Sequence, residues 1–208
     1  MKHISIKTLL LALLFVVAVP CVNAQVAHIG DILCTTGVYV SPAEFEASGL
    51  EAMGVIFYVD ATGQHGWAVA LEDAGSFRWC SGTIDTPLPN YNSTRAAIYD
   101  QNGLFNTQEV LNWDAPYNYT FPIFEALDVD NGWYLPAIGQ LNYLYGNLIE
   151  VNEGLAVAGG TIFVMTSSWT YWSSTEYSGA SAWILTNSGR LNTAGQSYTY
   201  RARGVRNF

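Results

Sequence analysis

The sequence predicts an α+β fold with mixed or antiparallel sheets, a few short helices and one longer helix. Residues 29–71 contain runs of β-branched and aromatic side chains, residues 93–150 contain helix start signals, and residues 161–207 return to strand-like runs. Such segregation of strands from helices along a chain is typical of α+β domains. Because no internal repeat or linker interrupts residues 25–208, we expect them to form a single domain.

The first 24 residues have the layout of a secretory signal peptide. Lys2 and Lys7 precede an unbroken apolar run at residues 9–19, and small residues follow it. The run is shorter than the ~20 residues of a membrane-spanning helix, which disfavours a retained anchor. Lipoprotein processing at Cys21 is an alternative, although the preceding proline fits it poorly. We expect an exported protein, secreted or on the cell surface, with the periplasm as the alternative.

Charge excludes several classes of partner. Both lysines lie in the signal peptide, so the mature chain keeps six arginines against 17 acidic residues, a net charge of −11. Binding to nucleic acid or to an anionic membrane depends on Lys and Arg side chains that neutralise phosphates. We therefore expect no nucleic-acid partner and no membrane insertion after cleavage.

The lead-in at residues 25–90 is rich in strands. A continuous apolar run at residues 53–59 predicts a strand buried on both faces. A glycine-containing turn and a second run at residues 67–71 complete a predicted hairpin. Earlier strands are expected at residues 29–33 and 37–40, followed by a short helix that begins at Ser41 and Pro42.

Helices are expected in the middle of the chain and strands at its end. The longest helix is predicted near residues 137–150, where Leu141, Leu144, Tyr145 and Leu148 recur at helical spacing. Shorter helices are expected at residues 95–100, 106–111 and 122–127, and strands at residues 161–165, 171–173, 182–186, 190–193 and 198–207.

Several ordered motifs identify a resemblance over residues 131–208. They are the GWYLP run at residues 132–136, QLNYLY at 140–145, YWSSTE at 171–176, Ala182-Trp183, Gly189 and RGVR at 203–206. This series resembles the C-type-lectin-like domains of the branch that includes the formylglycine-generating enzyme, in particular the bacterial group at the end of collagen-like adhesins. The resemblance implies a C-type-lectin-like fold with a core and ligand-facing hairpins at residues 131–208.

The residues of these motifs also have a structural interpretation. Trp133 and Trp172 are large enough to hold the helix against the sheet. Arg203 and Arg206 could pair with Glu176 and so fix the last strand. Cys34 and Cys80 could form a disulfide after export, or remain two buried thiols; the sequence leaves both open.

Metal and catalytic motifs are missing. The calcium motifs that the resemblance would require for sugar binding are absent, and residues 128–132 lack the spacing of a calcium loop. His28 and His65 are the only mature histidines, which argues against a zinc site. The active-site cysteines of the formylglycine-generating relatives have no counterpart in the C-terminal half. We expect no metal, no cofactor and no enzymatic activity.

The C-terminal segment has the composition of a binding surface. Between Trp172 and Tyr200 the chain is dominated by Tyr, Ser, Thr, Asn and Gly, as in antibody combining sites, where tyrosine supplies rigid contact area and small polar residues supply hydrogen bonds. The alternative is that polar hairpin edges simply have this composition. The predicted contact residues are Tyr177, Ser178, Ser181, Thr186, Asn187, Arg190, Asn192, Thr193, Gln196, Tyr198 and Tyr200.

Three functions follow from these observations. The first is an exported adhesin or receptor-binding domain whose partner is a cell-surface protein or a glycan. The second is a structural subunit of a surface fibre, and the third is an enzyme of the formylglycine-generating type. Residues 171–208 also resemble the variable segment of proteins diversified by bacterial and phage retroelements.

Overall fold

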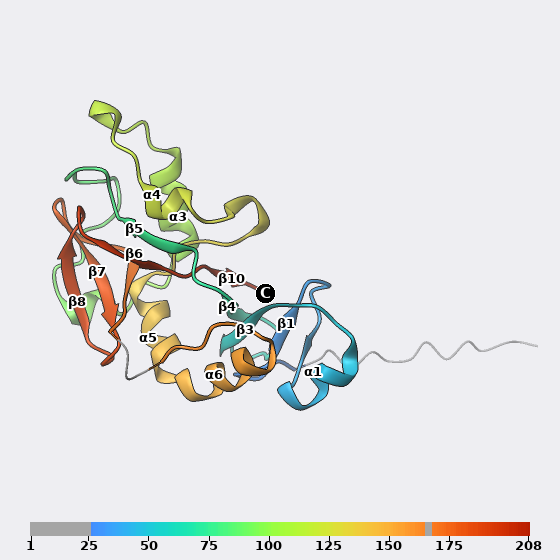
Figure 1. Ribbon diagram of the computed structural model, residues 1–208. Coiled ribbons are helices and arrows are strands. Elements are labelled where there is room, and N and C mark those ends of the chain that lie inside the picture. The colour runs from blue at the N-terminus through green and yellow to red at the C-terminus, as the bar shows by residue number, and fades with distance from the viewer. Residues whose placement is uncertain (1–25, 165–167) are drawn as a thin grey trace, which may run out of the picture.

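The computed structural model describes residues 26–164 and 168–208. The expected signal peptide lies outside the described residues, as does the last residue of the strand expected at 161–165. The described part of the chain contains two five-stranded sheets and several short helices (Figure 1). The predicted α+β class is therefore confirmed. Among the helices of the described residues, none is both long and apolar enough to cross a membrane.

The first sheet joins the lead-in to the last strand of the chain. Its strands are antiparallel and lie in the order β10-β4-β3-β1-β2. The predicted hairpin is β3 and β4, and Asp60 closes its turn by accepting hydrogen bonds from the backbone of Thr62 and Gly63. The strands are β1 (Ile32–Cys34), β2 (Tyr39–Val40), β3 (Ala52–Val59), β4 (Gly66–Ala70) and β10 (Val205–Asn207), with α1 (Pro42–Ser48) between β2 and β3.

The second sheet has the order β5-β9-β6-β7-β8 and is antiparallel except between β6 and β9. Its edge strand β5 comes from the lead-in, whereas β10 leaves this half for the first sheet. The run expected at residues 198–207 is therefore two strands, because the chain passes from one sheet to the other at residues 203–204. The strands are β5 (Gly75–Arg78), β6 (Thr170–Ser178), β7 (Ser181–Thr186), β8 (Leu191–Gly195) and β9 (Thr199–Ala202).

The longer helix predicted near residues 137–150 is divided in two. Asn147 leaves helical geometry, with φ −116° and ψ 23°, and its side chain donates to the backbone oxygen of Phe57 on β3 at 3.0 Å. This bond to the first sheet explains why the helix turns at that point. The helices are α2 (Thr94–Ala97), α3 (Gly103–Asn112), η1 (Pro116–Asn118), α4 (Pro122–Glu125), η2 (Val129–Asn131), α5 (Ile138–Gly146) and α6 (Leu148–Val157).

The strand expected at residues 161–165 is absent over residues 161–164. The side chain of Asn152 on α6 donates to the backbone oxygen of Phe163 at 2.9 Å and accepts from its backbone nitrogen at 2.8 Å. A side chain thus satisfies the backbone groups that a neighbouring strand would otherwise pair. The prediction was wrong because an apolar run does not reveal whether a partner strand lies beside it.

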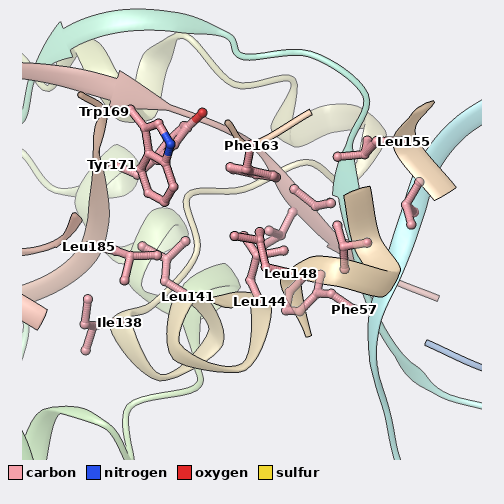
Figure 2. Packing of buried hydrophobic residues seen from close by; sticks show 14 of the residues in the cluster. Phe57, Ile138, Leu141, Leu144, Leu148, Leu155, Phe163, Trp169, Tyr171 and Leu185 are labelled. Atoms are coloured by element: carbon pink, nitrogen blue, oxygen red, sulfur yellow. The ribbon is translucent and has the colours of Figure 1, made fainter. Parts of the chain in front are cut away.

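The main hydrophobic core lies between the sheets and the α5–α6 pair. Leu141 and Leu144 of α5 and Leu148 of α6 meet Phe57 from the first sheet and Leu185 from the second (Figure 2). A second cluster, around Trp79 and Trp172, fills the opposite side of the second sheet, next to α3 and α4. Cys34 belongs to the main core and Cys80 to the second cluster, and both are free thiols.

Candidate functional site

A polar cleft opens where two strands of the second sheet separate. β6 and β9 pair at a single register position, Tyr171 opposite Arg201, and diverge beyond it. The space between them has a volume of about 370 Å³. We name it the β6–β9 cleft; it is lined by Ser76, Ser168, Trp169, Thr170, Thr186, Asn187, Thr199, Tyr200 and Arg201.

Two tyrosines, Tyr198 just before β9 and Tyr200 on β9, lie at this cleft. The rings of Tyr198 and Tyr200 lie nearly parallel, 6.3 Å apart at 15°. Tyr200 also meets the buried Trp172 edge-on at 5.1 Å, which fixes its orientation. Tyr198 is 61% exposed, and its ring lies beside Gly195 of β8. One ring is therefore anchored in the fold and the other is presented to solvent.

An ion-pair cluster supports the floor of the β6–β9 cleft. Asp73 lies 3.3 Å from Arg201 and 3.8 Å from the buried Arg203, and Tyr171 donates to it at 2.8 Å. Burial and the nearby Asp73 carboxylate raise the pKa of Tyr171 to about 12, which keeps this hydroxyl a donor. Arg203 donates to the backbone oxygen of Ala70, and burial lowers its pKa. The charged side chains at this end of the sheet thus pair mainly with one another.

Four of the predicted contact residues lie at or beside the β6–β9 cleft. Thr186, Asn187 and Tyr200 line it, and Tyr198 stacks on Tyr200. Asn192 pairs with Ile184 of the second cluster and so points to the same face of the sheet, but it lies on the edge strand β8 and is not among the residues that line the cleft.

The remaining contact candidates are dispersed. Tyr177 packs on Trp183 in the main core, and Thr193 lies opposite Trp183 on that same face. Ser178 and Ser181 pair at the far end of the β6–β7 hairpin, and the exposed Arg190 occupies the turn between β7 and β8. The structure therefore does not join the predicted set into one surface.

Gln196 is a correction, because it is fully buried and cannot meet a ligand from solvent. Its side chain donates to the backbone oxygen of Ile84 at 2.9 Å and to Glu176 at 3.0 Å, and accepts from the backbone nitrogen of Ile84 at 3.0 Å. The polar composition around residue 196 suggested exposure, but the loop at residues 79–90 covers it.

The predicted pairing of Glu176 with the terminal arginines is wrong. Glu176 is fully buried and accepts hydrogen bonds from Gln196 and from the backbone and hydroxyl of Thr86. Burial raises its pKa to about 7. Arg203 pairs with Asp73 instead, and the guanidinium of Arg206 lies 5.4 Å from the ring centre of Trp133.

Sequence reasoning missed six residues of the cleft lining. Ser76 comes from β5, more than 100 residues before the C-terminal wall, so no local pattern could associate it with Thr199. Ser168, Trp169 and Thr170 precede the YWSSTE motif at residues 171–176 and belong to no motif themselves. Arg201 lies two residues before the RGVR motif, which begins at Arg203. Successive residues of a strand point to opposite faces. This alternation along the last strands is the signal that could have identified Arg201 as a surface residue.

Comparison with solved structures identifies a protein of similar fold. No family model matches the sequence, and no curated protein matches it. A solved structure described as a fimbrial protein from Bacteroides ovatus ATCC 8483 matches with a TM-score of 0.67 at 21% sequence identity. The match covers 88% of this chain and 49% of that protein, so the chain spans about half its length. The likeness shows a shared fold; the C-type-lectin-like assignment stays a prediction.

Proposed function

We propose that this chain is an exported domain of a surface fibre. The supporting observation is that its fold matches, over 88% of the chain, about half of a protein described as fimbrial. This favours the structural-subunit alternative over a free-standing adhesin. Export rests on the signal-peptide layout of the first 24 residues.

One sheet edge fits assembly with a further strand. β8 is the outermost strand of the second sheet, and its five residues, LNTAG, include no charged side chain and no proline. Edge strands of proteins that stay monomeric are commonly protected by lysine, proline or a very short length. In the first sheet, the edge strand β2 has only two residues. The remaining edges are β10, with three residues, and β5, which carries Arg78. β8 is therefore the edge at which strand addition from another subunit is most favourable.

Assembly can be tested on the purified protein and on cells. We expect antibodies against the chain to label the cell surface and the fibres sheared from it. Asn192→Lys places a charge on the β8 edge and should reduce incorporation into sheared fibres several-fold, whereas Gln108→Lys, at an exposed position on α3, should not. Protein found only as a soluble monomer, never in sheared fibres, would refute the proposal.

Ligand binding is a second candidate function, favoured by the β6–β9 cleft and its exposed tyrosine. The lining is rich in hydroxyl and amide groups, and Tyr198 offers an aromatic surface beside it. The proposed partner is a cell-surface protein or a glycan, bound without a metal or a cofactor. Tyr198→Ala should abolish capture of that partner on a glycan and host-protein array, with Tyr117→Ala, at an 87% exposed site, as the matched control.

We propose no enzymatic activity. The formylglycine-generating alternative requires reactive thiolates, whereas burial raises the pKa of both Cys34 and Cys80. The two thiols also belong to separate hydrophobic clusters and so do not act as a pair. A substrate screen with and without copper tests this proposal, and copper-dependent turnover would contradict it.

A further inference from the structure

A second cleft lies away from the C-terminal hairpins, on both sides of Trp67. Two hollows of about 370 Å³ and 360 Å³ both border Trp67 and Asn207. We name their union the Trp67 cleft. On one side its wall is formed by residues around the start of α3, Gln101, Asn102, Phe105 and Gln108; on the other side it is formed by the β3–β4 hairpin.

The aromatic side chains of this cleft are held in place before any ligand arrives. The ring of Trp67 stacks on Tyr58 at 4.2 Å and 26°, and the edge-on Tyr143 of α5 lies 5.8 Å away. Phe105 on α3 is 53% exposed, so its ring is accessible from the cleft. Fixed rings reduce the entropy that binding would otherwise cost.

Four side-chain amides lie around these rings, and three of them have no hydrogen-bond partner among the described residues. Within residues 26–164 and 168–208, the side-chain amides of Gln101, Asn102 and Gln108 make no hydrogen bond. Asn207 accepts from the Tyr134 hydroxyl at 2.7 Å, which leaves its amide NH₂ group available to the cleft. Each amide can both donate and accept, as required for pairing with hydroxyl groups.

Charge further restricts the ligand class. The hollow beside α3 is lined by no charged side chain, and Asp60 in the other hollow is engaged by its own turn. The chain as a whole carries a formal net charge of −9. A ligand with carboxylate, sulfate or phosphate groups would therefore meet no Lys or Arg side chain among the residues that line the cleft, and would be repelled at longer range.

We propose that the Trp67 cleft binds an uncharged oligosaccharide. Aromatic rings provide flat apolar surfaces for the C–H faces of pyranose rings, and the amides around them pair with hydroxyl groups. Trp67 and Phe105 supply the former, and Asn207 with the glutamines of the α3 wall supplies the latter. The inference does not rest on the fibre proposal, since it concerns a different face of the molecule.

The test is a titration of the purified protein with neutral hexasaccharides of β-glucose, β-xylose, α-mannose and N-acetylglucosamine. Binding is followed by tryptophan fluorescence and by calorimetry. At least one probe should bind saturably, with a dissociation constant on the order of 0.1 to 1 mM. Phe105→Ala and Gln108→Ala, both at exposed positions, should each weaken binding about tenfold without changing the circular dichroism spectrum.

The controls separate this site from the other one. Tyr117→Ala removes an exposed aromatic ring elsewhere and should leave the affinity unchanged, as should Tyr198→Ala at the β6–β9 cleft. A hexamer of galacturonic acid should not bind. The proposal is overturned if no neutral hexasaccharide binds up to its solubility limit, or if Phe105→Ala and Gln108→Ala bind like the wild type. Binding lost only in Tyr198→Ala would also overturn it, and would favour the β6–β9 cleft.

Discussion

The two faces of the second sheet use neighbouring residues of the same strands for opposite purposes. On one face, Tyr171 and Leu185 are buried against α5 and the main core. On the other face, Trp172 and Ile184 are covered by the 79–90 loop, by Tyr200 and by side chains of α3 and α4, and this cover ends at the β6–β9 cleft. A sheet can therefore be covered along its length on one side and left open at one end on the other. Successive side chains along a strand point to opposite faces, and here both faces receive apolar residues. Whether a face is open to solvent therefore depends on which segments cover it.

The largest effect on stability is expected from removal of the Trp172 side chain, which lies under the 79–90 loop and Tyr200. Trp172 is fully buried, and its indole nitrogen donates to the backbone oxygen of Phe77 on β5. Trp172→Ala should lower the free energy of unfolding by about 3–5 kcal/mol, since it leaves a cavity and an unpaired carbonyl. Urea unfolding measures this. A loss below about 1 kcal/mol would mean that the loop and Tyr200 do not pack tightly on this face.

The next largest effect is a pH dependence from Glu176, the carboxyl on β6 that the 79–90 loop covers. The pKa of Glu176 is about 7 when folded, against an ordinary value of 4.5, because burial and nearby Asp85 disfavour its charge. The folded state therefore holds a proton that the unfolded state has lost between pH 4.5 and 7. Stability from this group is fully present below pH 4.5 and is lost as the pH rises through 7, by about 3 kcal/mol.

Glu176→Gln isolates this contribution. The neutral amide keeps hydrogen-bond partners in Thr86 and Gln196 but cannot ionise. The difference in unfolding free energy between wild type and variant should grow in favour of the variant from pH 5 to pH 8, measured by urea unfolding. Parallel pH profiles for the two proteins would contradict the buried, protonated carboxyl.

A smaller effect distinguishes the anchored tyrosine from the exposed one. Tyr200→Ala removes an edge-on contact with Trp172 and should cost about 2 kcal/mol. Tyr198→Ala, at a 61% exposed position, should cost less than about 0.5 kcal/mol. Thermal unfolding of the two variants checks this order. Equal losses would place both rings in the core and remove Tyr198 as a binding residue.

The smallest effect on stability is expected inside the open cleft. The Thr186 hydroxyl lies 3.0 Å from that of Ser188 in an exposed turn, so Thr186→Ala should change the unfolding free energy by less than about 0.5 kcal/mol. The same substitution should weaken capture of a ligand in the β6–β9 cleft several-fold. Unchanged capture together with unchanged stability would show that the open end of the sheet does not touch the ligand.

Local elements were the most predictable part of the fold. The hairpin of β3 and β4 and the strand β7 were expected within two residues of their observed bounds, because their apolar runs and turn residues lie together in the sequence. The division of the long helix at Asn147 was not predictable, since its cause is a hydrogen bond to Phe57, 90 residues away.

The candidate site was predicted in part. Composition selected Tyr198, Tyr200 and Thr186, which lie at or beside the β6–β9 cleft, but it also selected the buried Gln196. A polar side chain looks the same in sequence whether it meets solvent or a buried carboxyl such as Glu176.

By itself, the sequence determined the α+β class, the main strands and the polar character of the C-terminal segment. These depend on residues that are neighbours along the chain, where periodicity and turn chemistry act. Only the tertiary structure decided which polar residues are buried with Glu176, that β5 and β10 exchange sheets, and that clefts form beside Tyr200 and Trp67. Those features depend on contacts between segments far apart in the sequence. Such contacts stabilise the fold only after the chain has brought the segments together, so no local pattern encodes them.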